Sequence, residues 1–250
     1  MNFNPFSLAA KRVMVSGASS GIGRQVAINC AAMGAQVVVT GRDPARLADT
    51  ANQLAGDGHL SIAADLRDPD GLARVADEAG DLHGIVHAAG IARLAPFRMI
   101  SEKHMNEVFS INVHAPLLLT RALLAKKRIL GGGSIVFIGS VGSHIGPVAT
   151  TAYSASKAAL LGAMRSLAQE VVKQGIRANL IAPGYIRTPM LEQLGAGGAK
   201  LQDLIDYAPL GLGEPDDVAN AAVFYLSDAS RWMTRTFFII DGGMTVKMSI

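Results

Sequence analysis

A tyrosine and a lysine four positions apart, Tyr153 and Lys157, are the side chains best placed for proton transfer. They lie in a run of small, helix-compatible residues, and positions i and i+4 fall on the same face of a helix. A free tyrosine titrates near pH ~10, but a neighbouring cation favours the phenolate and lowers that pKa. The spacing therefore suggests a general acid or base tuned toward neutral pH. A packed tyrosine beside a solvated lysine has the same spacing and is the alternative.

The elements that must position this pair alternate along the chain. Strands are expected near 12–16, 36–40, 59–63, 84–88, 134–139, 176–182 and 237–241. Helices are expected near 22–33, 45–54, from 69 onward, and over 101–129, 151–174 and 215–226. Strands that are apolar throughout and separated by helices predict a parallel sheet covered on both faces. We therefore expect one α/β domain over 1–250, a doubly wound, Rossmann-like parallel sheet that binds ligands at the carboxyl ends of its strands.

A glycine-rich turn follows the first expected strand, where residues 16–24 read SGASSGIGR. Gly17, Gly21 and Gly23 allow a tight turn and a close approach of the backbone to a ligand. The helix that begins there offers free N–H groups to a phosphate. After the first strand of a doubly wound sheet this pattern indicates a dinucleotide site, and a glycine-rich turn without a ligand is the alternative.

The end of the second strand holds Gly41 and Arg42 rather than an acidic residue. An acidic residue there would bind the ribose hydroxyls of NAD, whereas an arginine, planar and always charged, accommodates the 2′-phosphate of NADP. Asp43 is expected instead to cap the helix that Pro44 begins. The sequence therefore predicts NADP(H) in preference to NAD(H).

The composition fits a globular protein: of 250 residues, 50% are hydrophobic and 17% charged, with a formal net charge of +3. Nucleic-acid binding would need clustered charge, and the short basic cluster at 126–128 is expected to end a helix. The single cysteine, Cys30, permits no internal disulfide and no zinc spacing, so we predict a buried thiol and no metal site. Neither a signal sequence nor a long apolar run is recognised, so we expect a cytoplasmic protein without membrane or nucleic-acid partners.

Together these motifs resemble the short-chain dehydrogenases/reductases (SDRs) along essentially the whole chain. The resemblance implies an NAD(P)-dependent enzyme that interconverts a ketone and a secondary alcohol, in which the cofactor carries the hydride and the protein handles the proton. One departure is His87, where the family usually has asparagine; a histidine inside a strand is expected to be a structural donor. The matching pieces, in order, are Gly17-x-x-x-Gly21-x-Gly23, Asp65, Ala88-Ala89-Gly90, Asn112, Ser140, Tyr153-x-x-x-Lys157, Pro183-Gly184 with Thr188, and Asp241-Gly242-Gly243.

The resemblance also implies a role for each site residue. Tyr153 would be the general acid or base, Lys157 would lower its pKa and bond the nicotinamide ribose, and Ser140 would donate to the substrate oxygen. Asn112 would hold a water that relays protons to Lys157; a helix-interior asparagine satisfied locally is the alternative. Asp65 would contact the adenine. Cofactor contacts are expected from Gly17, Ser19, Ser20, Gly21, Ile22, Gly23, Arg42, Asp65, Leu66, Ala88, Ala89, Gly90, Tyr153, Lys157, Pro183, Gly184, Ile186 and Thr188.

The substrate pocket is expected beneath a mobile lid of low regularity, 185–212, for which an ordinary surface loop is the alternative. Residues 91–97 and 141–147, with Met190, should line it. They are largely apolar and suit a carbonyl on a medium-sized, partly apolar molecule. Arg93, His144 and Arg187 are the candidate polar contacts.

The C-terminal third, notably 209–219 and 241–244, is most similar to 3-oxoacyl-[acyl-carrier-protein] reductases. That similarity implies an acidic carrier that meets Lys127, Arg128 and Lys173 at helix ends. Many sugar, polyol and steroid dehydrogenases share the pattern, so another secondary alcohol is the alternative. A non-catalytic dinucleotide sensor on the same fold is less favoured, because a sensor needs no complete catalytic set. The family further implies a homotetramer, for which 117–119, 160–167 and 237–240 offer apolar surface.

Overall fold

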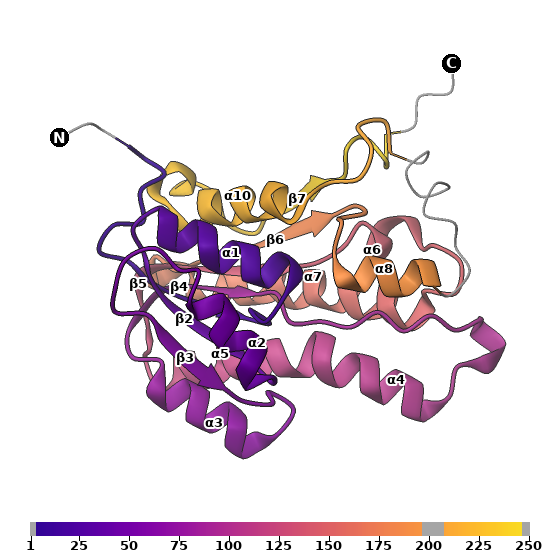
Figure 1. Cartoon of the computed structure of the whole chain (residues 1–250), viewed down its shortest axis with the longest axis horizontal. Coiled ribbons are helices and arrows are strands. Elements are labelled where there is room, and N and C mark those ends of the chain that lie inside the picture. Colours follow the sequence, from indigo (N-terminus) through magenta and orange to yellow (C-terminus); the bar gives the residue numbers. More distant parts are fainter. Residues whose placement is uncertain (1–3, 197–207, 247–250) are drawn as a thin grey trace.

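The computed structural model describes residues 4–196 and 208–246 and has one parallel sheet at its centre, with helices on both faces (Figure 1). The seven strands are ordered β3-β2-β1-β4-β5-β6-β7, and each neighbouring pair is parallel. This confirms the predicted doubly wound α/β fold, although β5 starts earlier than the sequence suggested. The strands are β1 (Arg12–Ser16), β2 (Gln36–Gly41), β3 (Leu60–Ala63), β4 (Leu82–His87), β5 (Ile129–Ile138), β6 (Arg177–Pro183) and β7 (Phe237–Ile240).

Helices begin where the sequence supplies a proline or a capping side chain. Pro44, Pro69 and Pro215 each stand in the first turn of a helix, where a missing N–H leaves no bond unmade. Asp43 caps its helix by accepting the N–H of Arg46 at 3.1 Å, as predicted. The helices are α1 (Gly21–Ala32), α2 (Pro44–Ala51), α3 (Pro69–Glu78), α4 (Glu102–Phe109), α5 (Ala115–Ala125), α6 (Gly142–Ile145), α7 (Thr151–Val171), α8 (Pro189–Ala196) and α10 (Pro215–Leu226).

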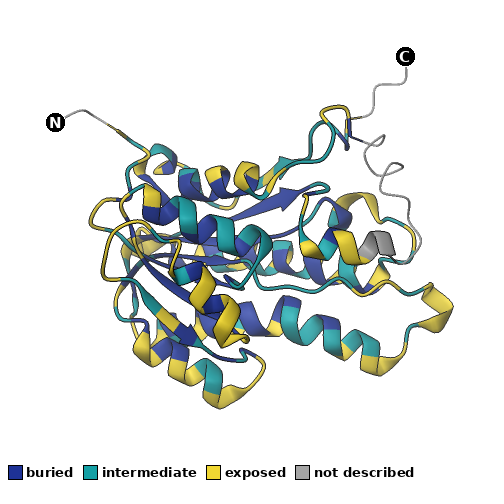
Figure 2. Ribbon diagram, in the orientation of Figure 1, coloured by how far each residue is buried: buried dark blue, intermediate teal, exposed yellow. Residues whose placement is uncertain are grey.

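Each strand contributes to two cores, because successive side chains point to opposite faces of a sheet. In β1, Val13 and Val15 pack on the face that α1 and α10 cover, whereas Met14 packs on the face that α3, α5 and α7 cover. Figure 2 shows burial concentrated in the strands and exposure on the outer helix surfaces. Cys30 is buried in the first core, as predicted. The apolar strands are thus explained by helices on both sides.

The stretch predicted as one helix over 101–129 is interrupted and ends earlier. A π-helical turn, Ser110–His114, separates α4 from α5. Pro116 stands two residues after this turn and has no N–H to donate, so a wider turn accommodates the missing bond. The chain leaves the helix at Lys126, and Lys127 takes a left-handed φ of 54° on the way to β5. The basic cluster therefore ends a helix, as predicted.

The same stretch, Glu102–Ala125, is long and apolar enough by length and composition to cross a membrane, although the sequence had suggested no such run. Its most apolar window has a mean hydropathy of 1.4 and is 44% buried inside the protein. Leu119 and Leu123 within it are fully buried against the sheet. Core packing therefore accounts for much of its apolar character.

The predicted lid, 185–212, is more regular at its start than expected. It contains α8, which a proline at its first position and the following MLEQL favour, whereas residues 197–207 lie outside the described part of the chain. Ile186 forms a parallel bridge with Gly213. Gly213 N–H donates to Tyr185 O at 3.0 Å, and Arg187 N–H donates to Gly213 O at 2.8 Å. Both ends of the segment are thereby fixed beside β6.

The order in which the chain adds strands to the sheet reverses between β1 and β4. The chain runs outward from β1 through β2 to β3, then returns to pair β4 with the other side of β1. The loops that leave β1 and β4 diverge at this point, which opens a crevice at the carboxyl ends of the strands. Gly17 and the turn at Ala88 lie there, so the crevice forms where the motifs predicted a ligand site.

Candidate active site

Tyr153 and Lys157 project from adjacent turns at the start of α7. The Lys157 Nζ lies over the tyrosine ring, 5.8 Å from its centroid. Lys157 is only 5% exposed, and its ammonium donates to the Ile138 backbone oxygen at 2.9 Å. The structure thus brings the two predicted proton-transfer groups together at the end of β5.

Burial dominates the titration of this pair. It raises the pKa of Tyr153 above its usual 10.0, and the hydrogen bond from Ser140 opposes that rise only in part. Burial also lowers the pKa of Lys157 from 10.5 to about 8. The net shift of the Tyr153 pKa is therefore upward rather than toward neutral pH, because burial disfavours the charged phenolate. The separate expectation that Lys157 lowers this pKa stays a prediction.

Ser140 follows β5 and shares a side-chain hydrogen bond with Tyr153. Its Oγ also accepts the N–H of Gly142 at 3.0 Å, which fixes the hydroxyl at the start of α6. Two hydroxyls therefore stand side by side at the edge of the cleft. Such a pair can bond one substrate oxygen from two directions.

Asn112 lies in the π-helical turn and is fully buried. Its amide brackets the Ile91 backbone, accepting the N–H at 2.9 Å and donating to the oxygen at 3.0 Å. It also donates to Ser156 Oγ at 2.9 Å, and Ser156 in turn donates to Tyr153 O at 2.6 Å. Asn112 is thus satisfied by the protein itself, which matches the alternative stated for it, and its water-holding role stays a prediction.

Ser156 was not predicted, although it stands directly before Lys157. Its hydroxyl ties the π-helical turn to α7, and so ties Asn112 to the catalytic helix. A side chain at Gly90 would place its Cβ 3.3 Å from Asn112 Oδ1 and 3.4 Å from Lys157 Nζ. The glycine therefore lets the β4 turn approach both groups closely.

The glycine turn after β1 forms a cradle at the start of α1. Gly17 has a φ of 71°, and a Cβ there would lie 2.5 Å from the Ala89 nitrogen. Ser20 precedes α1 without a side-chain cap, so the first N–H groups of the helix face the crevice. This arrangement fits the pyrophosphate of a dinucleotide.

Two side chains that the sequence did not single out hold the glycine turn in place. Arg24 donates to the Ser19 oxygen at 2.7 Å and to Thr50 Oγ1 at 3.0 Å. Thr50 in turn donates to the Ala18 oxygen at 2.8 Å. Arg24 stands inside the motif, but its partner on α2 is distant in sequence, so only the fold shows the bond.

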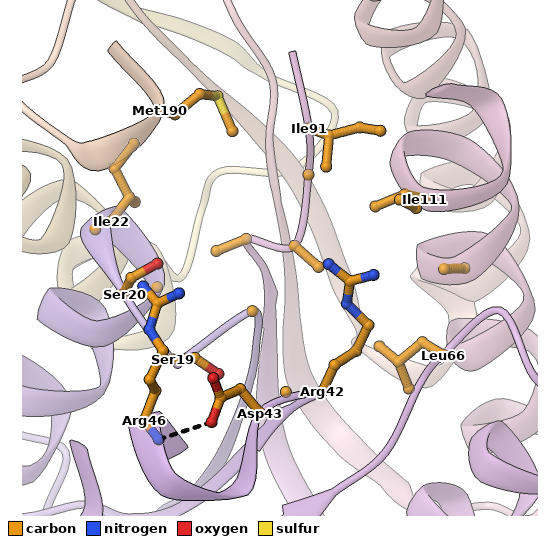
Figure 3. A pocket seen from close by; sticks show the side chains of 18 of the residues that line it. Ser19, Ser20, Ile22, Arg42, Asp43, Arg46, Leu66, Ile91, Ile111 and Met190 are labelled. Atoms are coloured by element: carbon orange, nitrogen blue, oxygen red, sulfur yellow. Dashed lines mark hydrogen bonds between the residues drawn. The ribbon is translucent and has the colours of Figure 1, made fainter. Parts of the chain in front are cut away.

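Most of the predicted cofactor contacts line one cleft of about 640 Å³ across the switch point (Figure 3). The others lie in an adjoining cleft of about 270 Å³ beside Ser140, and Ile22, Ala88, Gly90, Thr188 and Met190 line both. The first cleft holds Gly17, Ser19, Ser20, Gly21, Ile22, Gly23, Arg42, Asp65, Leu66, Ala88, Ala89, Gly90 and Thr188, and the second adds Tyr153, Lys157, Pro183, Gly184 and Ile186. Asn112 is absent from both linings.

Two arginines, Arg42 after β2 and Arg46 on α2, point into the larger cleft (Figure 3). Any side chain at Gly41 would collide with Ser19 Oγ, so an acidic residue has no room there while Ser19 keeps its place. Arg46 was not predicted as a contact. Asp43, which caps α2, lines the same end, so the two arginines leave a net positive charge there that suits a phosphate.

Asp65 follows β3, and its carboxylate is held by Arg67 Nε, 3.0 Å from both oxygens. That bond lowers the pKa of Asp65 and keeps it ionised. Leu66 is buried beside it on the cleft wall. The adenine contact predicted for Asp65 stays a prediction, and Arg67 is an additional lining residue that the motif did not reveal.

His87 takes a structural position, as expected. Thr120 donates its hydroxyl to the Pro116 oxygen at 2.8 Å, so His87 Nε2 must donate to Thr120 Oγ1 across 2.8 Å. The ring stacks on Phe137 with centroids 5.0 Å apart. Burial lowers its pKa to about 3, so the imidazole is neutral and links β4 to α5.

The polar contacts predicted for the substrate pocket are elsewhere. Arg93 pairs with Glu107 and Arg187 with Glu214, each at 2.8 Å. Neither arginine lines the smaller cleft, and His144 does not line it either. These residues are candidates because they lie in or near the cleft loops in the sequence. In the structure the two arginines instead form ion pairs with acidic residues of other segments.

The basic residues predicted to meet a carrier also lie away from this chain's clefts. Lys127 and Arg128 precede β5, and Lys173 precedes β6. They therefore stand at the amino ends of the strands, whereas Ser140 follows the carboxyl end of β5. A ten-residue strand spans on the order of 30 Å. Helix C-termini in such a fold face the edge opposite the ligand crevice, which explains the mismatch.

Comparison with known proteins agrees with this geometry. A family model described as Enoyl-(Acyl carrier protein) reductase matches residues 17–245. A galactitol 2-dehydrogenase (L-tagatose-forming) of Cereibacter sphaeroides is 33% identical, over 96% of this chain and 97% of that protein.

Two solved structures are similar over nearly their whole length. One, described as a short-chain alcohol dehydrogenase from Sinorhizobium meliloti 1021, has a TM-score of 0.91 and 32% identity, covering 98% of this chain and 100% of that chain. The other, described as an NAD(P)-dependent gluconate 5-dehydrogenase from Beutenbergia cavernae with NADP bound at low occupancy, has a TM-score of 0.88 and 34% identity with the same coverage. The chain is accordingly a member of the short-chain dehydrogenase/reductase family, and an oxidoreductase that acts on CH–OH groups.

Proposed function

We propose that this protein interconverts a ketone and a secondary alcohol with NADP(H), and that Tyr153 is the general acid or base. The observation that carries the proposal is the hydrogen bond between Tyr153 and Ser140 beside the buried ammonium of Lys157. This group opens onto the cleft that adjoins the glycine turn. Proton transfer and dinucleotide binding are thereby supported at one place.

The chain's own part in the reaction is to hold one oxygen and move one proton. Ser140 and Tyr153 bond the substrate oxygen, and Tyr153 gives its proton in reduction or takes one in oxidation. Lys157 stabilises the phenolate that forms in reduction, because its charge lies over the same ring. When bound, the nicotinamide supplies or accepts the hydride. Gly17, the start of α1 and the arginine wall would hold the rest of the dinucleotide.

The preference for NADP(H) over NAD(H) is supported by charge. Arg42 and Arg46 both face the cleft, and position 41 at the end of β2 is a glycine, which offers no carboxylate to the ribose. A similar structure also contains NADP. A 2′-phosphate would meet two guanidinium groups there, whereas a bare ribose would leave them unused.

Another secondary alcohol is favoured over a carrier-linked substrate. Two of the similar proteins are named for galactitol and gluconate, which supports the small-molecule alternative more than 3-oxoacyl-carrier reduction. The basic residues that would have met the carrier stand at the opposite edge of the sheet. A small carbonyl or alcohol is therefore the proposed substrate.

We also propose a homotetramer in the cytoplasm. Assembly is supported by exposed apolar residues on edge strand β7 and on α5, where Phe238 is 40% and Leu118 47% exposed. An unpaired strand edge with apolar side chains favours contact with another copy.

The decisive test replaces Tyr153 by phenylalanine. We expect kcat for the best ketone to fall by about 10³-fold, because the proton donor is lost, with a far smaller change in the Kd for NADPH, since the other expected cofactor contacts remain. Tyr225→Phe is the matched control: its hydroxyl bonds Thr236 at 2.7 Å and lines neither cleft, so turnover should persist. Unchanged turnover by the Tyr153 variant would refute the assignment. NADPH binding without turnover of any carbonyl would favour the sensor instead.

A further inference from the structure

The smaller cleft, beside Ser140 and Tyr153, has mostly apolar walls. Among the described residues that line it, Lys157 alone carries a charge; its ammonium donates one hydrogen bond to the Ile138 oxygen and lies over the Tyr153 ring. The relatives' named substrates, galactitol and gluconate, carry several hydroxyl groups, which a binding site must satisfy once they leave water. The apolar walls are formed by Ala92, Leu94, Val141, Val148, Met190 and Met244.

The remaining polar side chains described in this cleft are already engaged. Thr150 donates to the Pro147 oxygen at 2.5 Å, and Thr188 donates to the Ile186 oxygen at 3.2 Å. Tyr185 also has an interaction of its own. Ser140 and Tyr153 are needed for the reacting oxygen. Few of the side chains described in this lining are therefore left to bond further hydroxyls of a substrate.

The rim of the cleft, where it meets solvent, also carries apolar side chains. Leu94 is 42% exposed and Val148 is 94% exposed. They come from two loops that a hydrogen bond joins, Ala95 N–H to the Ala149 oxygen at 3.0 Å. The opening is thus flanked by apolar side chains on segments that support one another.

From these walls we infer that the site takes a ketone or secondary alcohol whose frame beyond the reacting carbon is apolar, and that it rejects polyols and sugar acids. The inference rests on the proposed function, since it names the substrate class of the same site. Each hydroxyl buried without a partner weakens binding by roughly tenfold to a hundredfold. A carboxylate suffers more, because Lys157, the one charged residue described in this lining, is buried beside Tyr153, and no second cation is described there.

A substrate panel tests this selectivity. The purified full-length chain with NADP⁺ is assayed on 4-phenylbutan-2-ol, cyclohexanol, galactitol and gluconate, and their ketones are assayed with NADPH. We expect kcat/KM for the better apolar compound to exceed that for either polar compound by at least ~100-fold. Equal or higher kcat/KM for galactitol or gluconate would overturn the inference and leave the proposed function intact.

Calorimetry separates the two claims if no compound reacts. The NADPH-loaded protein is titrated with 4-phenylbutan-2-one and, separately, with gluconate. Binding of the ketone without turnover would uphold the apolar site and refute the proposed function. Absence of ketone binding would refute the apolar site and would not bear on the proposed function, which the Tyr153→Phe variant tests.

A substitution at the rim of the cleft tests whether its apolar side chains determine the selectivity. Leu94→Arg puts a cation at the rim, and we expect the ratio of kcat/KM for 4-phenylbutan-2-ol over gluconate to fall at least ~tenfold. Val172→Arg is the matched control, because Val172 is similarly exposed (46%) but precedes β6 at the opposite edge of the sheet. If Leu94→Arg melts below the assay temperature, Val148→Arg replaces it. An unchanged ratio in a folded rim variant would contradict the inference.

Discussion

The ammonium of Lys157 is buried, so we expect it to make the free energy of unfolding depend on pH. Its pKa falls from 10.5 in the unfolded chain to about 8 in the folded one. Below pH 8 both states hold the proton, and the folded state bears the full cost of a buried cation. Between these two values the unfolded chain binds more protons, so the contribution of Lys157 to the free energy of unfolding rises with pH.

We predict that Lys157→Met changes this dependence. The stability of the wild-type protein relative to the variant should increase by about 2 kcal/mol between pH 7 and pH 9.5, because the buried lysine loses its charge in the folded state first. Urea unfolding at the two pH values measures the difference. The same offset at both pH values would mean that Lys157 titrates normally.

Arg42 should decide between the two dinucleotides. We expect Arg42→Ala to lower kcat/KM with NADPH by about tenfold or more, while kcat/KM with NADH changes little, because only the 2′-phosphate needs the guanidinium. Arg231→Ala removes the same charge from an exposed site outside the larger cleft and should leave the ratio unchanged. A native preference for NADH that Arg42→Ala does not alter would reverse the proposal.

The motif residues could be placed from the sequence because their spacing and neighbouring strands fix where they go. Tyr153 and Lys157 share a helix face by periodicity alone. Ser156, Arg46 and Arg24 could not be assigned, because their partners are brought near only by the fold. The raised pKa of Tyr153 was missed for a similar reason, since desolvation depends on packing rather than on spacing.

The turn between β1 and α1 tolerates only glycine at its first position. We predict that Gly17→Ala lowers the free energy of unfolding by about 2 kcal/mol or more and abolishes NADPH binding, because the φ is positive and a Cβ meets Ala89. Gly162→Ala, in the middle of α7 with no atom within 4 Å of a new Cβ, should instead stabilise by about 0.5–1 kcal/mol. Denaturation and NADPH titration of both variants measure these effects. An equally small effect at both positions would contradict the role of the turn.

Strand positions were the most predictable elements, whereas interruptions within helices were not. The strands could be located from runs of apolar residues, because helices cover both faces of the sheet. The π-helical turn at Ser110–His114 leaves the apolar periodicity almost unchanged, so the sequence pattern predicts one continuous helix there. Likewise, the glycines near 195–198 favour irregular structure, so α8, which begins before them, could not be predicted.

Assembly can be tested at the sheet edge. β7 is the last strand in the order, and Phe238 on it is 40% exposed. We expect light scattering to give a tetramer for the wild-type protein and a smaller particle for Phe238→Lys, because a charge there opposes burial of the edge. Val172→Lys, exposed outside that strand, should leave the mass unchanged. A monomeric wild-type protein would refute the tetramer.

The bridge between Ile186 and Gly213 brings the two ends of a long excursion to one point beside β6. Closing a loop at its base costs little more free energy as the loop lengthens, so insertions or exchanges between these ends should be tolerated. The excursion also contributes Met190 and Leu191 to the apolar walls, while the glycine turn and α7 lie outside it. Grafting this segment from a relative, with Ile186 and Thr188 kept because they are expected cofactor contacts, therefore offers a route to a different substrate range while Tyr153 and Lys157 stay in place.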